Sequence, residues 1–214
     1  MEKNTIEIFE KDKLIRDLKE KEPRDFYNDY LLGQDVWYFS KQEISNPSNH
    51  YDKFKKHISK KLNIHFNNIS IIGSAKTRFS LNPKNNFSEF RDSLEDNPSD
   101  LDIVLVSQEL FYETWRSFRK ISKNKSIHNY EIKTSEIFRQ FISIRDKDEI
   151  YDDTHIKEWI RKVSSLKADM QTIFSISLDV NYRIYKNWEA VEDYHINGIK
   201  KLQEKLDDLL NKKD

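Results

Sequence analysis

Two carboxylates separated by one residue, Asp100 and Asp102, stand directly before an apolar run over residues 103–106. Because side chains alternate along a strand, both carboxylates are expected on one face at the start of that strand. An apolar pair also precedes Gly73-Ser74, where a turn of small residues would let backbone N–H groups approach phosphates. Mg²⁺ is usually held by one or two carboxylates together with substrate phosphates. These residues therefore predict a site for a divalent cation and a phosphorylated ligand.

The two segments together resemble a known signature. Gly-Ser-Ala-Lys-Thr-Arg-Phe-Ser-Leu from Gly73, followed by Ser-Asp-Leu-Asp-Ile-Val from Ser99, is similar to the pattern of the DNA polymerase beta-like nucleotidyltransferase superfamily, in particular its small stand-alone bacterial members. The resemblance covers about residues 69–106. The spacing departs from the usual pattern, because 25 residues (75–99) separate the two halves. The excess is polar, over Asn82 to Pro98, and is typical of an inserted surface loop, which costs little entropy.

The resemblance implies a chemistry for these residues. A nucleotidyltransferase lets an acceptor hydroxyl attack the α-phosphate of a nucleoside triphosphate (NTP), and pyrophosphate leaves. Mg²⁺ or Mn²⁺ ions held by three carboxylates stabilise the attacking and leaving oxygens. Asp100 and Asp102 would be two of these catalytic, metal-binding acids. Gly73 and Ser74 would contact the β- and γ-phosphates.

The third carboxylate is expected on a neighbouring strand. Residues 174–185 alternate between apolar and polar side chains, which predicts a half-buried strand. Asp179 lies in the middle of its polar face and is therefore the best candidate. A solvent-facing acid on an edge strand is the alternative for Asp179. If the strand assignment is wrong, Asp169, Asp152 or Asp153 could take the role.

Three further residues after Gly73-Ser74 are candidates for binding the nucleotide. Lys76 and Arg78 could neutralise triphosphate charge, and Ser80 could contact a phosphate. Exposed positions on a helix or turn, and a capping role for Ser80, are the alternatives. Arg183 follows on the polar face of the 174–185 strand, where it could bind phosphate or pair with an acid.

Several other chemistries are disfavoured. The chain has no cysteine, which excludes disulfides, thiolate metal sites and cysteine nucleophiles and fits a reducing compartment. Its six histidines form no close pair of the kind that binds zinc. A P-loop needs two glycines where this chain has Ser70 and Ala75.

Charge and hydropathy constrain partners and location. The 214-residue chain carries 37 basic and 37 acidic side chains, whereas dedicated nucleic-acid binders usually have a basic excess. Basic runs at 53–61 and 116–125 leave an RNA-binding protein without chemistry as one alternative. No apolar stretch is long enough to span a bilayer, and the first residues lack an apolar signal core. A cytoplasmic protein without membrane contact is expected.

The pattern of elements predicts an α+β fold, with a small mixed sheet flanked by many helices. Three segments are expected within one compact domain: an N-terminal helical segment (1–50), a nucleotidyltransferase core (51–186) and a C-terminal helix (187–214). Leu202, Leu206 and Leu209 give that last segment its helical spacing.

Substrate and partners stay open at this level. The resemblance implies transfer of NMP from an NTP to a nucleic acid, a protein or a small molecule, in a regulatory, antibiotic-modifying, toxin-like or phage-defence (antiviral) role. A homo-oligomer or a partner protein is compatible with such roles. The alternative is a catalytically inactive nucleotide-sensing or partner-binding module of the same fold. The acidic insertion, with Glu89, Asp92, Glu95 and Asp96, could occlude a site.

Overall fold

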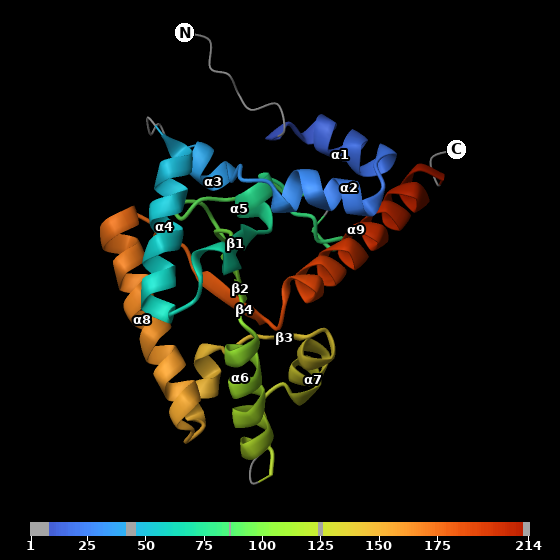
Figure 1. The fold of residues 1–214 in the computed structure, drawn as a ribbon. Coiled ribbons are helices and arrows are strands. Elements are labelled where there is room, and N and C mark those ends of the chain that lie inside the picture. Colours follow the sequence, from blue (N-terminus) through green and yellow to red (C-terminus); the bar gives the residue numbers. More distant parts are fainter. Residues whose placement is uncertain (1–8, 42–45, 86, 124–125, 212–214) are drawn as a thin grey trace. The chain divides into compact units, whose positions relative to one another are not determined.

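Four strands form one mixed sheet (Figure 1). The computed structural model describes residues 9–41, 46–85, 87–123 and 126–211. The strands follow the order β1-β2-β4-β3. β2 pairs parallel with β4, and β3 pairs antiparallel with β4. The α+β class is therefore confirmed. The strands are β1 (Ile69–Ile72), β2 (Leu101–Val106), β3 (Phe141–Ile142) and β4 (Val180–Tyr185).

The chain divides into two compact units, each built from segments that are distant in the sequence. The first unit contains residues 1–51, 71–99 and 192–214, and the second contains residues 52–70 and 100–191. The three consecutive segments expected from the sequence do not follow this division, and as functional regions they stay a prediction.

Several short helices and most of the long helix α9 build the first unit. Pro23 begins α2, a position that proline favours because its missing N–H would be unsatisfied there anyway. Gln203 of α9 donates to the carbonyls of Leu18 and Lys21, at 2.7 and 3.0 Å, where α1 ends and its last carbonyls lack helical partners. The helices are α1 (Lys11–Glu20), α2 (Pro23–Tyr27), a π-helical turn (Asn28–Leu32), α3 (Trp37–Ser40), α5 (Ser74–Thr77), the start of α4 (Pro47–Leu62) and most of α9 (Trp188–Asn211).

The core of this unit is formed by apolar side chains from α1, α2, the π-helical turn, α9 and the segment after α5. Its members are Leu14, Leu18, Phe26, Tyr27, Tyr30, Leu31, Phe79, Phe87, Ile199 and Leu202. Leu14 and Leu18, four residues apart, are fully buried and give α1 its inward face. The inserted loop therefore contributes Phe87 to a core.

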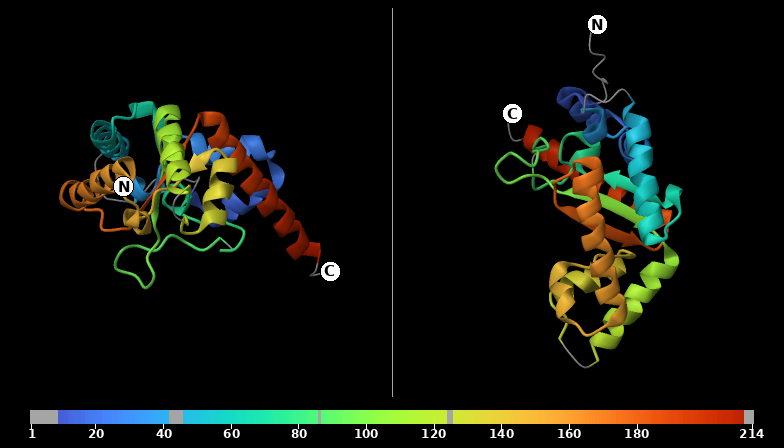
Figure 2. Two further views of the ribbon diagram at one scale, coloured as in Figure 1. Left: turned by 90° about the horizontal axis from the view of Figure 1, so that it is seen from below. Right: turned by 90° about the vertical axis from the view of Figure 1, so that its left-hand side faces the viewer.

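The second unit surrounds β2, β3 and β4 with longer helices. Ser107 and Asp153 cap α6 and α8, because their side chains accept from the N–H groups of Leu110 and Ile156 at 3.2 Å each. α8 lies beside the second-unit part of α4 (Figure 2), and Phe174 meets Phe54 edge-on at 5.5 Å. The helices are α6 (Gln108–Ile121), α7 (Tyr130–Phe138), α8 (Thr154–Phe174) and two 3₁₀ turns (Phe66–Asn68, Asp146–Ile150).

The predicted strand over 174–185 is wrong in its first half. α8 continues to Phe174, and Ser175 ends it with a left-handed backbone, at φ 56°. β4 begins only at Val180. The alternation of burial is nevertheless present, because Ile176, Leu178, Tyr182 and Ile184 are buried and the residues between them are more exposed.

Among the described residues, no helix combines the length and the apolar character needed to cross a bilayer.

The C-terminal helical segment corresponds to α9, which begins at Trp188.

The insertion from Asn82 to Pro98 is attached to the rest of the first unit by a lysine. Lys41 forms an ion pair with Asp92. Its ammonium also lies over the rings of Trp37, Tyr38 and Phe90, at 5.0, 4.6 and 5.2 Å from their centres. Three aromatic faces and one carboxylate around an ammonium combine cation–π and charge attraction.

The first prediction concerns this attachment. Lys41→Met keeps the aliphatic chain but removes the charge, so we expect the free energy of unfolding to fall by about 1 kcal/mol. Amide exchange around Phe90 should accelerate, because the Phe90 N–H donates to the carbonyl of Arg78 at the base of the insertion and loses this protection when the insertion loosens. Lys200→Met, at an exposed position of α9, is the control for loss of a lysine. Equal exchange rates in both variants would contradict the assignment.

Candidate functional site

The predicted carboxylate pair lies at the start of β2. Asp100 directly precedes the strand and is exposed, whereas Asp102 is its second residue with a quarter of its side chain exposed. Leu101 and Ile103, between and after them, are fully buried. The alternation of a strand therefore places both carboxylates on one face, at the polar start of an otherwise buried strand.

Two polar side chains of β4 meet this pair. β2 and β4 run parallel with Asp102 opposite Asn181, so these two residues share a face. Asn181 Nδ2 donates to Asp100 Oδ2 at 3.0 Å. Arg183 Nη2 lies 3.7 Å from Asp102 Oδ1, and its guanidinium carbon is 5.9 Å from the Phe141 ring centre on β3. Four polar side chains thus meet at one edge of two parallel strands; we call them the β2–β4 polar cluster.

The surroundings raise the pKa of Asp102. Burial is the main cause, and the neighbouring Asp100 carboxylate acts in the same direction. The Arg183 charge and a hydrogen bond from Asn181 act in the opposite direction but do not outweigh burial. The fold by itself therefore disfavours the charged form of the Asp102 carboxylate. A bound cation would favour that charged form.

The best candidate for the third carboxylate does not join the cluster through its side chain. Asp179 directly precedes β4 rather than lying in its middle, and its carbonyl accepts from the Leu101 N–H at 2.8 Å. Its carboxylate pairs with Lys167 of α8 at 2.7 Å, and 76% of the side chain is exposed. The residue opposite Asp102 is the neutral Asn181. Asp179 as the third acid stays a prediction.

The alternative acids have other partners. Asp169 pairs with His57 and Lys61, at 2.8 Å each, between α8 and α4. Asp153 caps α8, and Asp152 pairs with Lys157. Across the part of the chain that the structure describes, no three His, Asp or Glu side chains form a group that could hold a metal ion.

The side chains of the β2–β4 polar cluster have donor atoms of the kind that the predicted cation prefers. Two carboxylates and an amide offer the oxygen ligands that Mg²⁺ and Mn²⁺ prefer. Mg²⁺ commonly uses only one or two carboxylates and completes its shell with water and substrate phosphates. Asp100 and Asp102, with Asn181 beside them, therefore fit such an ion in their chemistry, although they form no complete cage.

The Gly73-Ser74 turn lies in the first unit. Gly73 has φ 71° and ψ −158°, a conformation that residues with a Cβ essentially never adopt. Its carbonyl accepts from the N–H groups of Lys76 and Thr77, at 3.0 and 3.2 Å. Gly73 and Ser74 are both partly exposed, whereas the following Ala75 is buried. A glycine is thus required for the turn between β1 and α5.

Lys76 has a structural partner rather than an exposed ammonium. Only 2% of the residue is exposed, and its Nζ donates to the Gly33 carbonyl of the same unit. A buried ammonium needs such an acceptor, because an unpaired charge away from water is very costly. The placement shows a structural partner for Lys76, and its phosphate contact stays a prediction.

Arg78 and Ser80 belong to the base of the insertion. Arg78 Nε donates to Glu89 at 2.7 Å, and the Ser80 hydroxyl accepts from Asn82 N and Asn85 Nδ2 at 3.3 and 3.2 Å. Both side chains are partly exposed. Their contacts show how the insertion is held, and their nucleotide-binding role stays a prediction.

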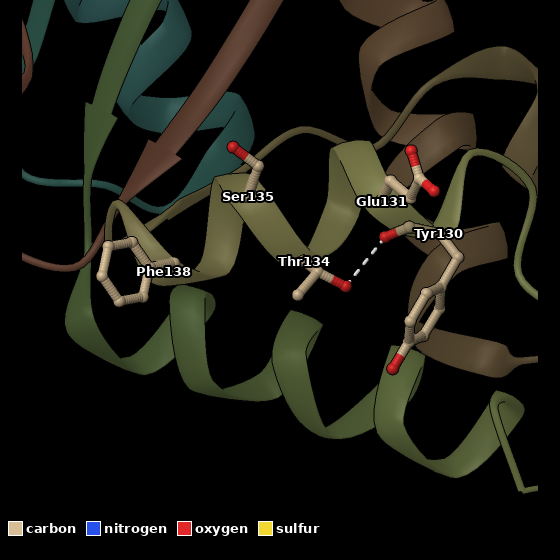
Figure 3. A pocket seen from close by; sticks show the side chains of 5 residues that line it. All are labelled: Tyr130, Glu131, Thr134, Ser135 and Phe138. Atoms are coloured by element: carbon tan, nitrogen blue, oxygen red, sulfur yellow. Dashed lines mark hydrogen bonds between the residues drawn. The ribbon is translucent and has the colours of Figure 1, made fainter.

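A surface hollow of about 440 Å³ lies on α7 (Figure 3). It is lined by Tyr130, Glu131, Thr134, Ser135 and Phe138, all from this one helix. The Thr134 hydroxyl donates to the Tyr130 carbonyl at 2.9 Å, which satisfies the hydroxyl within the helix. None of the predicted site residues lines this hollow, and sequence patterns gave no sign of it.

Comparison with known proteins adds no relative. No protein-family model, curated protein or solved structure matches the chain.

The second prediction tests the cost of the Asp102 carboxylate. Burial raises the pKa of Asp102, so its charged form is costly in the folded protein. Asp102→Asn removes this charge, and in the absence of divalent cations we expect the midpoint of thermal unfolding to rise by about 1–3 °C. Asp100→Asn, at the exposed position, should change the midpoint less. A lower midpoint for Asp102→Asn would show that the Arg183 attraction outweighs burial.

Proposed function

We propose that this protein is a metal-dependent nucleotidyltransferase that moves NMP from an NTP to an acceptor. The observation that carries the proposal is the Asp100 and Asp102 pair on one face at the start of β2, in a chain whose signature-like segment also contains the glycine-dependent turn at Gly73. The proposal is also supported by the oxygen-rich donor set of the β2–β4 polar cluster, which fits Mg²⁺ or Mn²⁺.

The proposed roles follow from residue chemistry. Asp100 and Asp102 would hold the cation, and a bound Mg²⁺ supplies charge stabilisation to the reacting phosphate oxygens. Gly73 would let backbone N–H groups approach the triphosphate, and Ser74 would add a hydroxyl donor. An acceptor hydroxyl would attack the α-phosphorus, the α–β phosphoanhydride bond would break, and pyrophosphate would leave with the bonding electron pair.

The acceptor and setting belong to the proposal in general terms only. A nucleic acid, a protein or a small molecule with a free hydroxyl satisfies the chemistry. The absence of cysteine fits a reducing compartment, so we place the reaction in the cytoplasm. A toxin-like or phage-defence role, which the resemblance of residues 69–106 implies, is the setting that we propose.

The third prediction tests catalysis directly. Purified protein, Mg²⁺ or Mn²⁺, each α-labelled NTP, total RNA and cell protein should give label on a macromolecule or a dinucleotide. Asp100→Ala and Asp102→Ala should each lower transfer by at least about 100-fold, because each removes a cation ligand. Asp193→Ala, at an exposed position of α9, is the matched control. Unchanged NTP binding and transfer in both site variants would refute the metal assignment.

The fourth prediction concerns Asp179. If this residue completes the set of acids, Asp179→Ala lowers transfer by about 100-fold, while NTP binding changes much less. Lys167→Gln frees the Asp179 carboxylate from its ion pair and should leave transfer intact or raise it. Full activity of Asp179→Ala would remove Asp179 from the catalytic set.

The alternative function is a nucleotide sensor or partner-binding module without catalysis. Two observations favour it: Asn181, rather than an acid, lies opposite Asp102, and the Asp179 carboxylate pairs with Lys167. Saturable, cation-dependent NTP binding without transfer of label to any component would support the sensor. Salt-dependent RNA affinity that the aspartate variants do not change would instead support an RNA-binding protein.

A further inference from the structure

The β2–β4 polar cluster contains its own cation. Arg183 lies on β4 two residues beyond Asn181, so both share the face of Asp102. The guanidinium is 3.7 Å from Asp102 Oδ1 and 5.9 Å from the Phe141 ring centre. About a quarter of the Asp102 and Arg183 side chains is exposed, so the pair is partly accessible to solvent.

The formal charge of this cluster is small. Asp100 and Asp102 contribute two negative charges, Arg183 contributes one positive charge, and Asn181 is neutral. Asp179 is neutralised separately by Lys167. A divalent cation that approaches Asp102 without a nucleotide therefore meets a carboxylate already paired with a guanidinium, and like charges repel at that distance.

We infer that Arg183 is a triphosphate-binding residue that pairs with Asp102 in the absence of substrate and exchanges Asp102 for a phosphate when nucleotide binds. This inference rests on the proposed function, because it assigns a role at the same site. Asp102 is released to the cation in the same exchange, so cation and nucleotide bind together rather than in sequence.

The chemistry of arginine suits this exchange. Its guanidinium presents several N–H donors in a planar fork that matches carboxylate and phosphate oxygens, and it stays charged in both situations. A contact of 3.7 Å to a partly exposed carboxylate is a weak ion pair, typically worth at most a few-fold in an equilibrium constant. A triphosphate carries more charge than one carboxylate and can therefore compete for Arg183.

The test measures binding rather than activity. Mn²⁺ affinity is determined by electron paramagnetic resonance of the free ion, first for Mn²⁺ alone and then with each of the four α,β-methylene ribonucleoside triphosphates, which cannot transfer NMP. The proteins are wild type, Arg183→Gln, Arg183→Lys and, as a matched control, Arg161→Gln at an exposed position of α8. Thermal unfolding verifies that each variant is folded.

The expected changes for Arg183→Gln have opposite signs. Without nucleotide, Mn²⁺ should bind about two- to fivefold more tightly, because the competing charge is gone. The affinity for the nucleotide analogue with Mn²⁺ should fall about tenfold or more, because a charged phosphate contact is lost. Arg183→Lys should keep wild-type Mn²⁺ affinity but bind the analogue more weakly, since an ammonium lacks the fork. Arg161→Gln should match wild type in both measurements.

Other outcomes separate this inference from the proposed function. If wild type binds Mn²⁺ with a nucleotide analogue but Arg183→Gln gains no Mn²⁺ affinity, or loses none for the analogue, the role of Arg183 is overturned and the proposed function stands. If the folded Arg183→Gln protein loses both affinities, Arg183 only supports the site and the exchange is refuted. If wild type binds neither Mn²⁺ nor any analogue, the proposed function fails and this inference fails with it.

Discussion

The parallel pairing of β2 with β4 is the constraint on which the candidate site depends. Its register runs from Leu101 opposite Val180 to Val106 opposite Tyr185. Paired residues share a face, so this register decides which polar side chain of β4 meets each carboxylate of β2. A slip of one residue would turn Asn181 and Arg183 to the opposite face. The buried remainder of both strands, including Leu105 and Ile184, fixes the register because any slip would expose it.

The same pairing explains which parts of the site sequence patterns could predict. The start of β2 was predictable, because two acids precede a continuous apolar run and alternation fixes their common face. The partner residues were not, since strand order and register arise from long-range packing. A pattern based on charge selects Asp179 as the third acid. Asn181 carries no charge and therefore gives no such signal, although the register sets it opposite Asp102.

Competition between helix and strand patterns explains the error at Phe174, whereas residues 175–179 form neither helix nor strand before β4 begins. Phe174 fits the apolar stripe of α8 as well as the alternation of the following segment, and its contact with Phe54 on α4 favours the helix. Lys76 shows how little spacing alone reveals about the partner of a side chain. Its spacing after Gly73-Ser74 suggested a phosphate contact, but its ammonium donates to Gly33, 43 residues earlier in the chain. No local pattern predicts so distant a partner.

The inserted loop illustrates how composition can conceal structure. Its polar residues predicted an exposed segment, and most of them are exposed. Phe87 and Phe90 within it are buried, however, and Lys41 and Arg78 each pair with one of its acids. Two of the acids that could occlude a site, Asp92 and Glu89, are therefore engaged in ion pairs within the first unit.

The surroundings of Asp102 make its charged form costly, and Arg183 offsets only part of that cost. Burial and the adjacent Asp100 raise its pKa, while the Arg183 charge and the hydrogen bond from Asn181 oppose this rise without outweighing burial. Asn181 opposite it shows that an amide fits at this edge of the sheet. A carboxylate held where its charge is disfavoured is typical of functional sites, where a ligand supplies the missing stabilisation. Arg183 supplies only part of it, at 3.7 Å, and a divalent cation bound with a nucleotide would supply the rest.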